Sequence, residues 1–210
     1  MKKGKFVVFE GIYGSGRIIV ELVNRLREAL AAEGTEVVEI DSPDTGRAQL
    51  MGAQELDSSW RYGVFESDFF FELAARARVC SVTREELARG KTVLCKNFTL
   101  ASIVYAELKG HDWFREDLNV LEARARGVQL GGEIAPDLTI FVDVAPAFAA
   151  KELGERMQGH FAPPDLERQL AFYRQELSKM PAGKAKVLKG ERSVEVLLAD
   201  ALEAIRALPK

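Results

Sequence analysis

The chain has 210 residues, of which 47% are apolar and 29% charged, and its formal net charge is −3 at neutral pH. This length and composition allow one sizeable hydrophobic core, and they predict a single domain over residues 1–210. The slight negative charge argues against nucleic acid and against an anionic membrane surface as partners.

Neither a membrane segment nor a targeting segment is expected. No apolar run approaches the roughly 20 residues that span a bilayer, and no charged-then-apolar leader marks a signal peptide. Cys80 and Cys95 lie in apolar or mixed surroundings, which is typical of reduced cysteines in a cytoplasmic protein. His111 and His160 have no metal-ligand spacing, and we interpret them as surface or loop residues.

Residues 6–30 predict a strand, a glycine-rich loop and a helix, in that order. Phe6 to Phe9 form a β-branched and aromatic run that indicates a buried strand. Gly11, Gly14 and Gly16 follow, and apolar residues then recur at helical spacing over 19–30. This order is typical of a phosphate-binding loop, in which backbone N–H groups and a helix N-terminus hold an oxyanion.

The loop departs from the phosphate-binding pattern after its last glycine. The pattern G-x-x-x-x-G-K-[ST] places a lysine on the phosphates and a hydroxyl on magnesium, whereas Arg17 and Ile18 stand here. Arg17 keeps a positive charge, but its planar fork does not replace an ammonium group at a tight site. Ile18 offers no oxygen. On these residues alone, a phosphate site and a plain tight turn both remain open.

Strands and helices are expected to alternate along the rest of the chain. The further strands are predicted at 37–40, 92–95, 138–144 and 187–189, and the further helices at 64–90, 102–108, 112–130, 166–180 and 194–208. A polar loop is expected at 41–47, and Gly159, Pro163 and Pro164 suggest another loop. This alternation predicts an α/β fold, a three-layer α/β/α sandwich around a parallel sheet of about five strands.

Ligands of open α/β sheets bind at the carboxyl ends of the strands. Lys96 and Asn97, directly after the strand at 92–95, are therefore candidates for an acceptor site. For Lys96, a phosphate-binding role and a structural role both remain open. Arg76 and Arg78 are interpreted as a solvated helix face. The alternative is a rebuilt cationic pocket for an anion, lined by Arg17, Arg76, Arg78, Lys96 and Lys109.

Three segments resemble the thymidylate kinase family. FVVFEGIYGSG at 6–16 resembles the family's first strand and loop, while RGKTVLC at 89–95 and PDLTIFVDV at 136–144 resemble later strands. The resemblance covers nearly the whole chain and implies a P-loop NTPase-like fold. It also implies transfer of a phosphoryl group from ATP to dTMP, and a lid-like segment around residues 146–165.

The resemblance also implies positions for the two nucleotides. The residues expected at ATP are Gly11, Gly14, Ser15, Gly16, Arg17, Ile18 and Arg192, the last in a turn near the adenine. Those expected at the acceptor nucleotide are Tyr13, Arg47, Phe71, Arg76, Arg78, Lys96, Asn97 and Tyr105. Phe71 corresponds to the aromatic that stacks on thymine, although a run of three phenylalanines is more often part of a core.

The family's chemical residues are the ones replaced in this chain. The loop aspartate, the base-reading arginine and the Asp-Arg pair of the acceptor site correspond to Tyr13, Ala75 and Lys96-Asn97. The arginine arrangement of the lid is not evident. We therefore assign no catalytic residue, except that Arg17 and Lys96 would serve in an active enzyme. ATP is expected to bind weakly if at all, and magnesium is not expected to be held directly by the loop.

Three functions follow from these residues. The first is a thymidylate-kinase-like protein with little or no phosphoryl transfer that retains binding of a nucleotide or a phosphate-like anion. The second is an active dTMP kinase, or a related nucleoside monophosphate kinase, that uses unusual residues. The third is a structural or interaction subunit without nucleotide binding. A homodimer is expected, because residues 64–82 carry phenylalanines on more than one side of a helix.

Overall fold

The computed structural model describes residues 4–40, 65–108, 110, 115–127, 132–153 and 163–209. Five parallel strands form one sheet in the order β2-β3-β1-β4-β5. The strands are β1 (Phe6–Gly11), β2 (Val37–Ile40), β3 (Thr92–Lys96), β4 (Leu138–Asp143) and β5 (Ala185–Lys189). The predicted fold class, α/β with a parallel sheet of about five strands, is confirmed.

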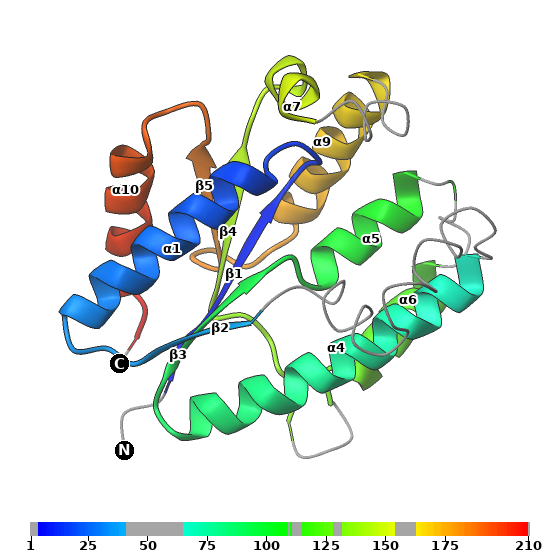
Figure 1. Cartoon of the computed structure of the whole chain (residues 1–210). Helices are drawn as coiled ribbons and strands as arrows, with labels where there is room; N and C mark the ends of the chain where they lie inside the picture. Colours follow the sequence, from blue (N-terminus) through cyan, green and yellow to red (C-terminus); the bar gives the residue numbers. More distant parts are fainter. Residues whose placement is uncertain are drawn as a thin grey trace, which may run out of the picture.

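Helices connect the strands and cover the sheet (Figure 1). They are α1 (Gly16–Ala32), α4 (Phe65–Ala88), α5 (Thr99–Leu108), α6 (Arg115–Ala125), α7 (Pro146–Glu152), α9 (Pro163–Ser178) and α10 (Val194–Arg206). Helices α1 and α10 lie together on one face, while α4 and α5 pack on the other. Among the described residues, no helix is long and apolar enough to cross a bilayer.

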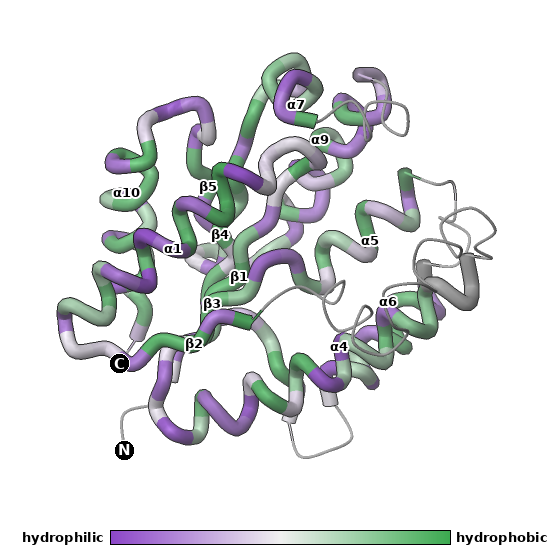
Figure 2. Tube along the Cα trace, viewed as in Figure 1, coloured by the Kyte–Doolittle hydropathy of each residue, from purple (hydrophilic) through white to green (hydrophobic). Residues whose placement is uncertain are grey.

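Strand β1 lies in the middle of the sheet, and this position explains why its residues are apolar on both faces. Val7 and Phe9 pack in one hydrophobic cluster with residues of α1, and Phe6 and Val8 pack in a second cluster with residues of α4. A strand covered on both faces reads as a continuous hydrophobic run. Helix α1 instead alternates hydrophobic and hydrophilic residues, as Figure 2 shows. Its buried residues are the predicted stripe, namely Ile19, Leu22, Val23, Leu26 and Leu30.

The prediction of a loop at Pro163 and Pro164 is wrong, because both residues lie in the first turn of a helix. Helix α7 begins at Pro146 and α9 at Pro163. Proline suits the first turn of a helix, because the N–H that it lacks would have no intrahelical acceptor there. The prolines that suggested a loop are therefore helix starts.

Several sequence predictions fall outside the described residues. These are the predictions for Arg47, Lys109, His111 and His160. Cys80 and Cys95 are both buried free thiols. Burial raises the pKa of Cys80 to about 11, so this thiol stays protonated at neutral pH.

Candidate functional site

The glycine-rich loop lies between β1, the middle strand of the sheet, and the start of α1. Gly14 has a φ of 91°, a conformation that side chains disfavour. A Cβ atom placed on Gly14 would lie 2.3 Å from the carbonyl oxygen of Ala149 in α7. Glycine is therefore required here both by the turn and by the close approach of α7.

Some polar groups of the loop already have partners inside the protein. The Tyr13 N–H donates to Oε1 of Gln169 in α9, at 2.9 Å. The buried Ser15 hydroxyl donates to the Ile12 carbonyl oxygen at 2.6 Å, and the Ser15 N–H donates to the same oxygen at 3.0 Å. Ser15 consequently holds the loop in shape instead of capping the helix with its side chain.

The N-terminus of α1 keeps the donors that an oxyanion needs. The first intrahelical hydrogen bond runs from the Ile19 N–H to the Ser15 carbonyl oxygen, at 3.1 Å. The N–H groups of Gly16, Arg17 and Ile18 precede it and have no acceptor within the helix. The first turn carries no acidic residue, so the positive end of the helix dipole is not neutralised there.

The side chains of Arg17 and Ile18 do not take the positions that the motif's lysine and hydroxyl residue would have at the phosphates and at magnesium. Arg17 is 84% exposed, and its Nη1 lies 3.4 Å from Oε2 of Glu152 at the end of α7. Ile18 packs against the main hydrophobic core. Magnesium prefers near-octahedral oxygen ligands, which Ile18 cannot supply, and the Ser15 hydroxyl is buried against the loop backbone. These loop side chains do not fit a bound magnesium ion, and the described residues contain no cluster of metal ligands.

Lys96 and Asn97 lie at the end of β3, the strand that pairs with β1. The Lys96 ammonium donates to Glu39 Oε1 on the neighbouring strand β2, at 2.7 Å, and both side chains are less than one-fifth exposed. Glu39 Oε2 also lies 3.5 Å from Arg27 Nη1. Asn97 adopts a φ of 57°, a left-handed conformation that asparagine tolerates better than most residues.

The interpretation of Arg76 as part of a solvated helix face is wrong. Arg76 is fully buried in α4, and its Nη2 donates to the Phe98 carbonyl oxygen at 3.0 Å and to Ser102 Oγ at 2.8 Å. Its Nε lies 3.4 Å from the buried Glu122 carboxylate, and the guanidinium lies 4.7 Å from the centre of the Phe98 ring. A buried guanidinium persists only with such partners. Arg78 is exposed, as expected.

Glu10 was missed in the sequence, although it is the one charged residue of the first strand. It is fully buried at the end of β1. Its Oε1 accepts a hydrogen bond from the Phe98 N–H at 2.8 Å, and its Oε2 accepts one from the Tyr173 hydroxyl at 3.2 Å. Burial raises the pKa of Glu10 to about 7, although the Phe98 N–H and the Arg76 charge oppose this rise.

The remaining candidates lie in different surroundings. Phe69 is buried, whereas Phe70 is 58% and Phe71 37% exposed, so the phenylalanine run is only partly core. Tyr105 is half-buried in α5. Arg192 follows β5 and pairs with Asp200 Oδ2 at 2.8 Å. The structure thus brings Arg76 and Glu10 together around Phe98, with Lys96 and Asn97 just before it in the chain, and pairs Arg192 with Asp200 of helix α10.

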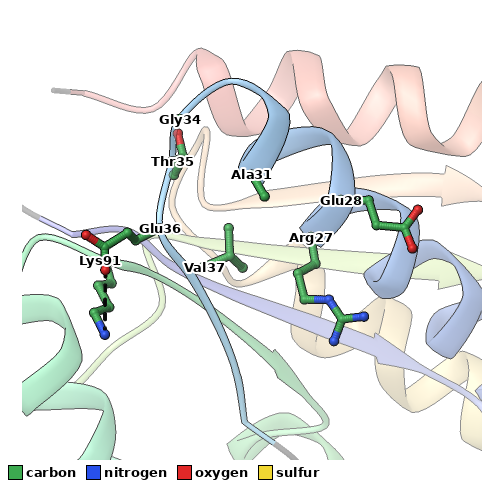
Figure 3. Close-up of a pocket in the computed structure, with 8 residues that line it drawn as sticks. All are labelled: Arg27, Glu28, Ala31, Gly34, Thr35, Glu36, Val37 and Lys91. Carbon is green, nitrogen blue, oxygen red and sulfur yellow. Dashed lines mark ion pairs between the residues drawn. The ribbon is translucent and has the colours of Figure 1, made fainter.

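A cavity of about 590 Å³ lies away from this site, between the end of α1 and the beginnings of β2 and β3 (Figure 3). It is lined by Arg27, Glu28, Ala31, Gly34, Thr35, Glu36, Val37 and Lys91. In a parallel sheet, the amino ends of the strands lie at the edge opposite to the carboxyl ends, where the glycine loop follows β1. This cavity is therefore separate from the loop.

Comparison with known proteins agrees with the resemblance in the sequence. The sequence model of the family described as thymidylate kinase matches residues 9–201. A thymidylate kinase of Burkholderia cenocepacia is 34% identical over 157 residues, which cover 73% of this chain and 72% of that protein. A thymidylate kinase of Ruegeria pomeroyi is 27% identical over 216 residues, covering 96% of this chain and 94% of that protein. Because the family match extends over most of the chain, this protein belongs to the thymidylate kinase family.

Proposed function

We propose that this protein is a thymidylate kinase family member with little or no phosphoryl transfer, whose loop still binds an oxyanion or a nucleotide phosphate weakly. The observation that carries the proposal is the placement of Arg17 and Ile18. Arg17 faces Glu152, and Ile18 packs into the core, at the two positions where the phosphate-binding pattern needs lysine and a hydroxyl.

Phosphoryl transfer depends almost entirely on positioning and on positive charge around the transferred group. The two cations proposed for an active enzyme, Arg17 and Lys96, each face a carboxylate of the same chain. Removing a single transition-state contact typically costs roughly 100- to 1000-fold in rate. Several losses together leave little catalysis, even though such losses do not add.

Weak anion binding is supported by the backbone instead of the side chains. The N–H groups of Gly16, Arg17 and Ile18 point along the start of α1, whose first turn contains no carboxylate. ATP would supply the transferable phosphoryl group if it bound here. We propose that its phosphates contact these N–H groups, and that magnesium is not held by the loop side chains.

A coupled ADP-release assay with dTMP and a panel of nucleoside monophosphates tests the proposal, with calorimetry for binding. We expect turnover to be undetectable or several orders of magnitude below that of an ordinary thymidylate kinase. Arg17→Lys combined with Ile18→Thr should not restore turnover, because the acceptor side still has Lys96-Asn97 in place of an Asp-Arg pair.

Substantial turnover that Lys96→Ala abolishes would overturn the proposal and establish an active kinase with a rebuilt site. Turnover that is insensitive to Lys96→Ala would indicate a contaminating kinase. Binding of neither nucleotide nor phosphate would favour the structural or interaction subunit.

The proposal includes a single domain over residues 1–210 that acts as a homodimer in the cytoplasm. Exposed apolar side chains on α4 support the homodimer: Phe70 and Phe71, with Val82 further along the helix. The buried free thiols of Cys80 and Cys95 support a reducing compartment.

A further inference from the structure

Helix α7 lies directly against the glycine loop, on the side where α1 begins (Figure 1). Ala149 is fully buried, and its backbone approaches Gly14 so closely that no side chain fits between them. The helix is also fixed at its start, where the Ala145 N–H donates to Glu191 Oε1 at 2.8 Å. Two separate contacts therefore set the position of α7 relative to the loop.

The last residue of α7 uses this position to reach the first turn of α1. Glu152 Oε2 lies 3.4 Å from Arg17 Nη1, and the Glu152 side chain is only 25% exposed. Arg17 is also one of the three residues whose N–H groups have no acceptor within α1. The Glu152 carboxylate is thus paired with the Arg17 guanidinium, which belongs to the same helix turn as the backbone N–H groups that an oxyanion would use.

We propose that Glu152 is an autoinhibitory carboxylate, which competes with polyphosphate ligands for Arg17 at the start of α1. The inference rests on the proposed binding of oxyanions at the loop. An incoming polyphosphate must displace Glu152 from Arg17, and it is also repelled by the carboxylate that remains nearby. Neutralising Glu152 removes both obstacles and leaves Arg17 available to the ligand.

The expected effect is modest, because Arg17 is exposed. Exposed ion pairs contribute little, and a polyphosphate carries several negative charges that Glu152 repels. We expect Glu152→Gln to tighten binding about three- to tenfold at low ionic strength. Half-molar salt should shrink the gain, since the Debye length then falls well below 10 Å.

The experiment is isothermal titration calorimetry with inorganic tripolyphosphate and with ATP. It compares the wild type, Glu152→Gln, Arg17→Gln and the double variant. Glu21→Gln is the matched control. Glu21 pairs with Arg25 in α1 at the same distance of 3.4 Å, and the substitution removes one negative charge, as Glu152→Gln does. Glu152→Ala is a second neutral variant, and circular dichroism verifies the fold of each protein.

The proposal expects tighter binding in Glu152→Gln, no comparable change in Glu21→Gln, and a clearly smaller gain from Glu152→Gln once Arg17 is Gln. Equal affinity of the wild type and both Glu152 variants would overturn the autoinhibitory role while leaving anion binding intact. A gain of undiminished size in the absence of Arg17 would also overturn it, by showing a general charge effect. Absence of binding in every variant would overturn the proposed anion binding and this inference together.

Discussion

Glu10 and Arg76 are buried ionisable residues, and both form a hydrogen bond with the backbone of Phe98. Phe98 donates its N–H to Glu10 and accepts from Arg76 through its carbonyl oxygen. The guanidinium also lies over the Phe98 ring. Desolvation nevertheless dominates at Glu10 and raises the pKa of its carboxyl group to about 7.

This burial predicts a pH-dependent stability. The pKa of Glu10 is raised from 4.5 to about 7, so the folded protein binds the proton more tightly than the unfolded chain does. The contribution of Glu10 to the free energy of unfolding is therefore largest below about pH 4.5, falls between about pH 4.5 and 7, and is flat above. The fall is roughly 3 kcal/mol at most.

Glu10→Gln should flatten this part of the pH profile, because an amide does not ionise. Urea denaturation at pH 5, 6, 7 and 8 measures the difference between the two proteins. The wild type should lose stability relative to Glu10→Gln as the pH rises, whereas the exposed Glu28→Gln should run parallel to the wild type. Parallel profiles for wild type and Glu10→Gln would refute a raised pKa.

At the scale of elements, the backbones of the glycine loop and of α7 are in close contact at Gly14 and Ala149. Gly14→Ala should destabilise the protein by about 2 kcal/mol or more, since the new Cβ meets the α7 backbone at 2.3 Å and φ is positive. Thermal or urea denaturation measures the loss.

Gly16→Ala is the matched comparison for the loop. A Cβ at Gly16 would meet no heavy atom of the described residues within 4 Å beyond its chain neighbours and the backbone of its own helix, and the residue lies in α1. Its stability should be unchanged or slightly increased, because alanine reduces the entropy of the unfolded chain. A Gly14→Ala variant as stable as Gly16→Ala would contradict the close packing of α7.

At the scale of the whole molecule, α4 leaves apolar side chains on the surface although it packs on the sheet and on α6. Light scattering at micromolar concentration should give the mass of a dimer. Replacing Phe70 and Phe71 by Ser should shift the protein toward the monomer, because these are the most exposed aromatic side chains of α4 among the described residues. Val187→Ser, an exposed apolar residue of β5, is the control. A monomer mass for the wild type would rule the homodimer out.

Local patterns in the sequence were sufficient for the order of the strands and for the helices other than α7, as well as for the glycine loop and the replacements at Arg17 and Ile18. These features depend on residues close together in the chain, where periodicity, glycine and proline act directly. The same patterns misjudged Pro163 and Pro164, because a proline can end a helix or begin one.

Only the tertiary structure decided the surroundings of the charged residues. The apolar residues of α4 lie around its circumference, so no periodicity indicated that Arg76 is buried. Lys96 meets Glu39 because β2 and β3 are neighbours, and Glu10 meets Tyr173 across 163 residues of chain. The partners and desolvation of a charge depend on which distant segments pack around it, and a single sequence carries no direct signal of that packing.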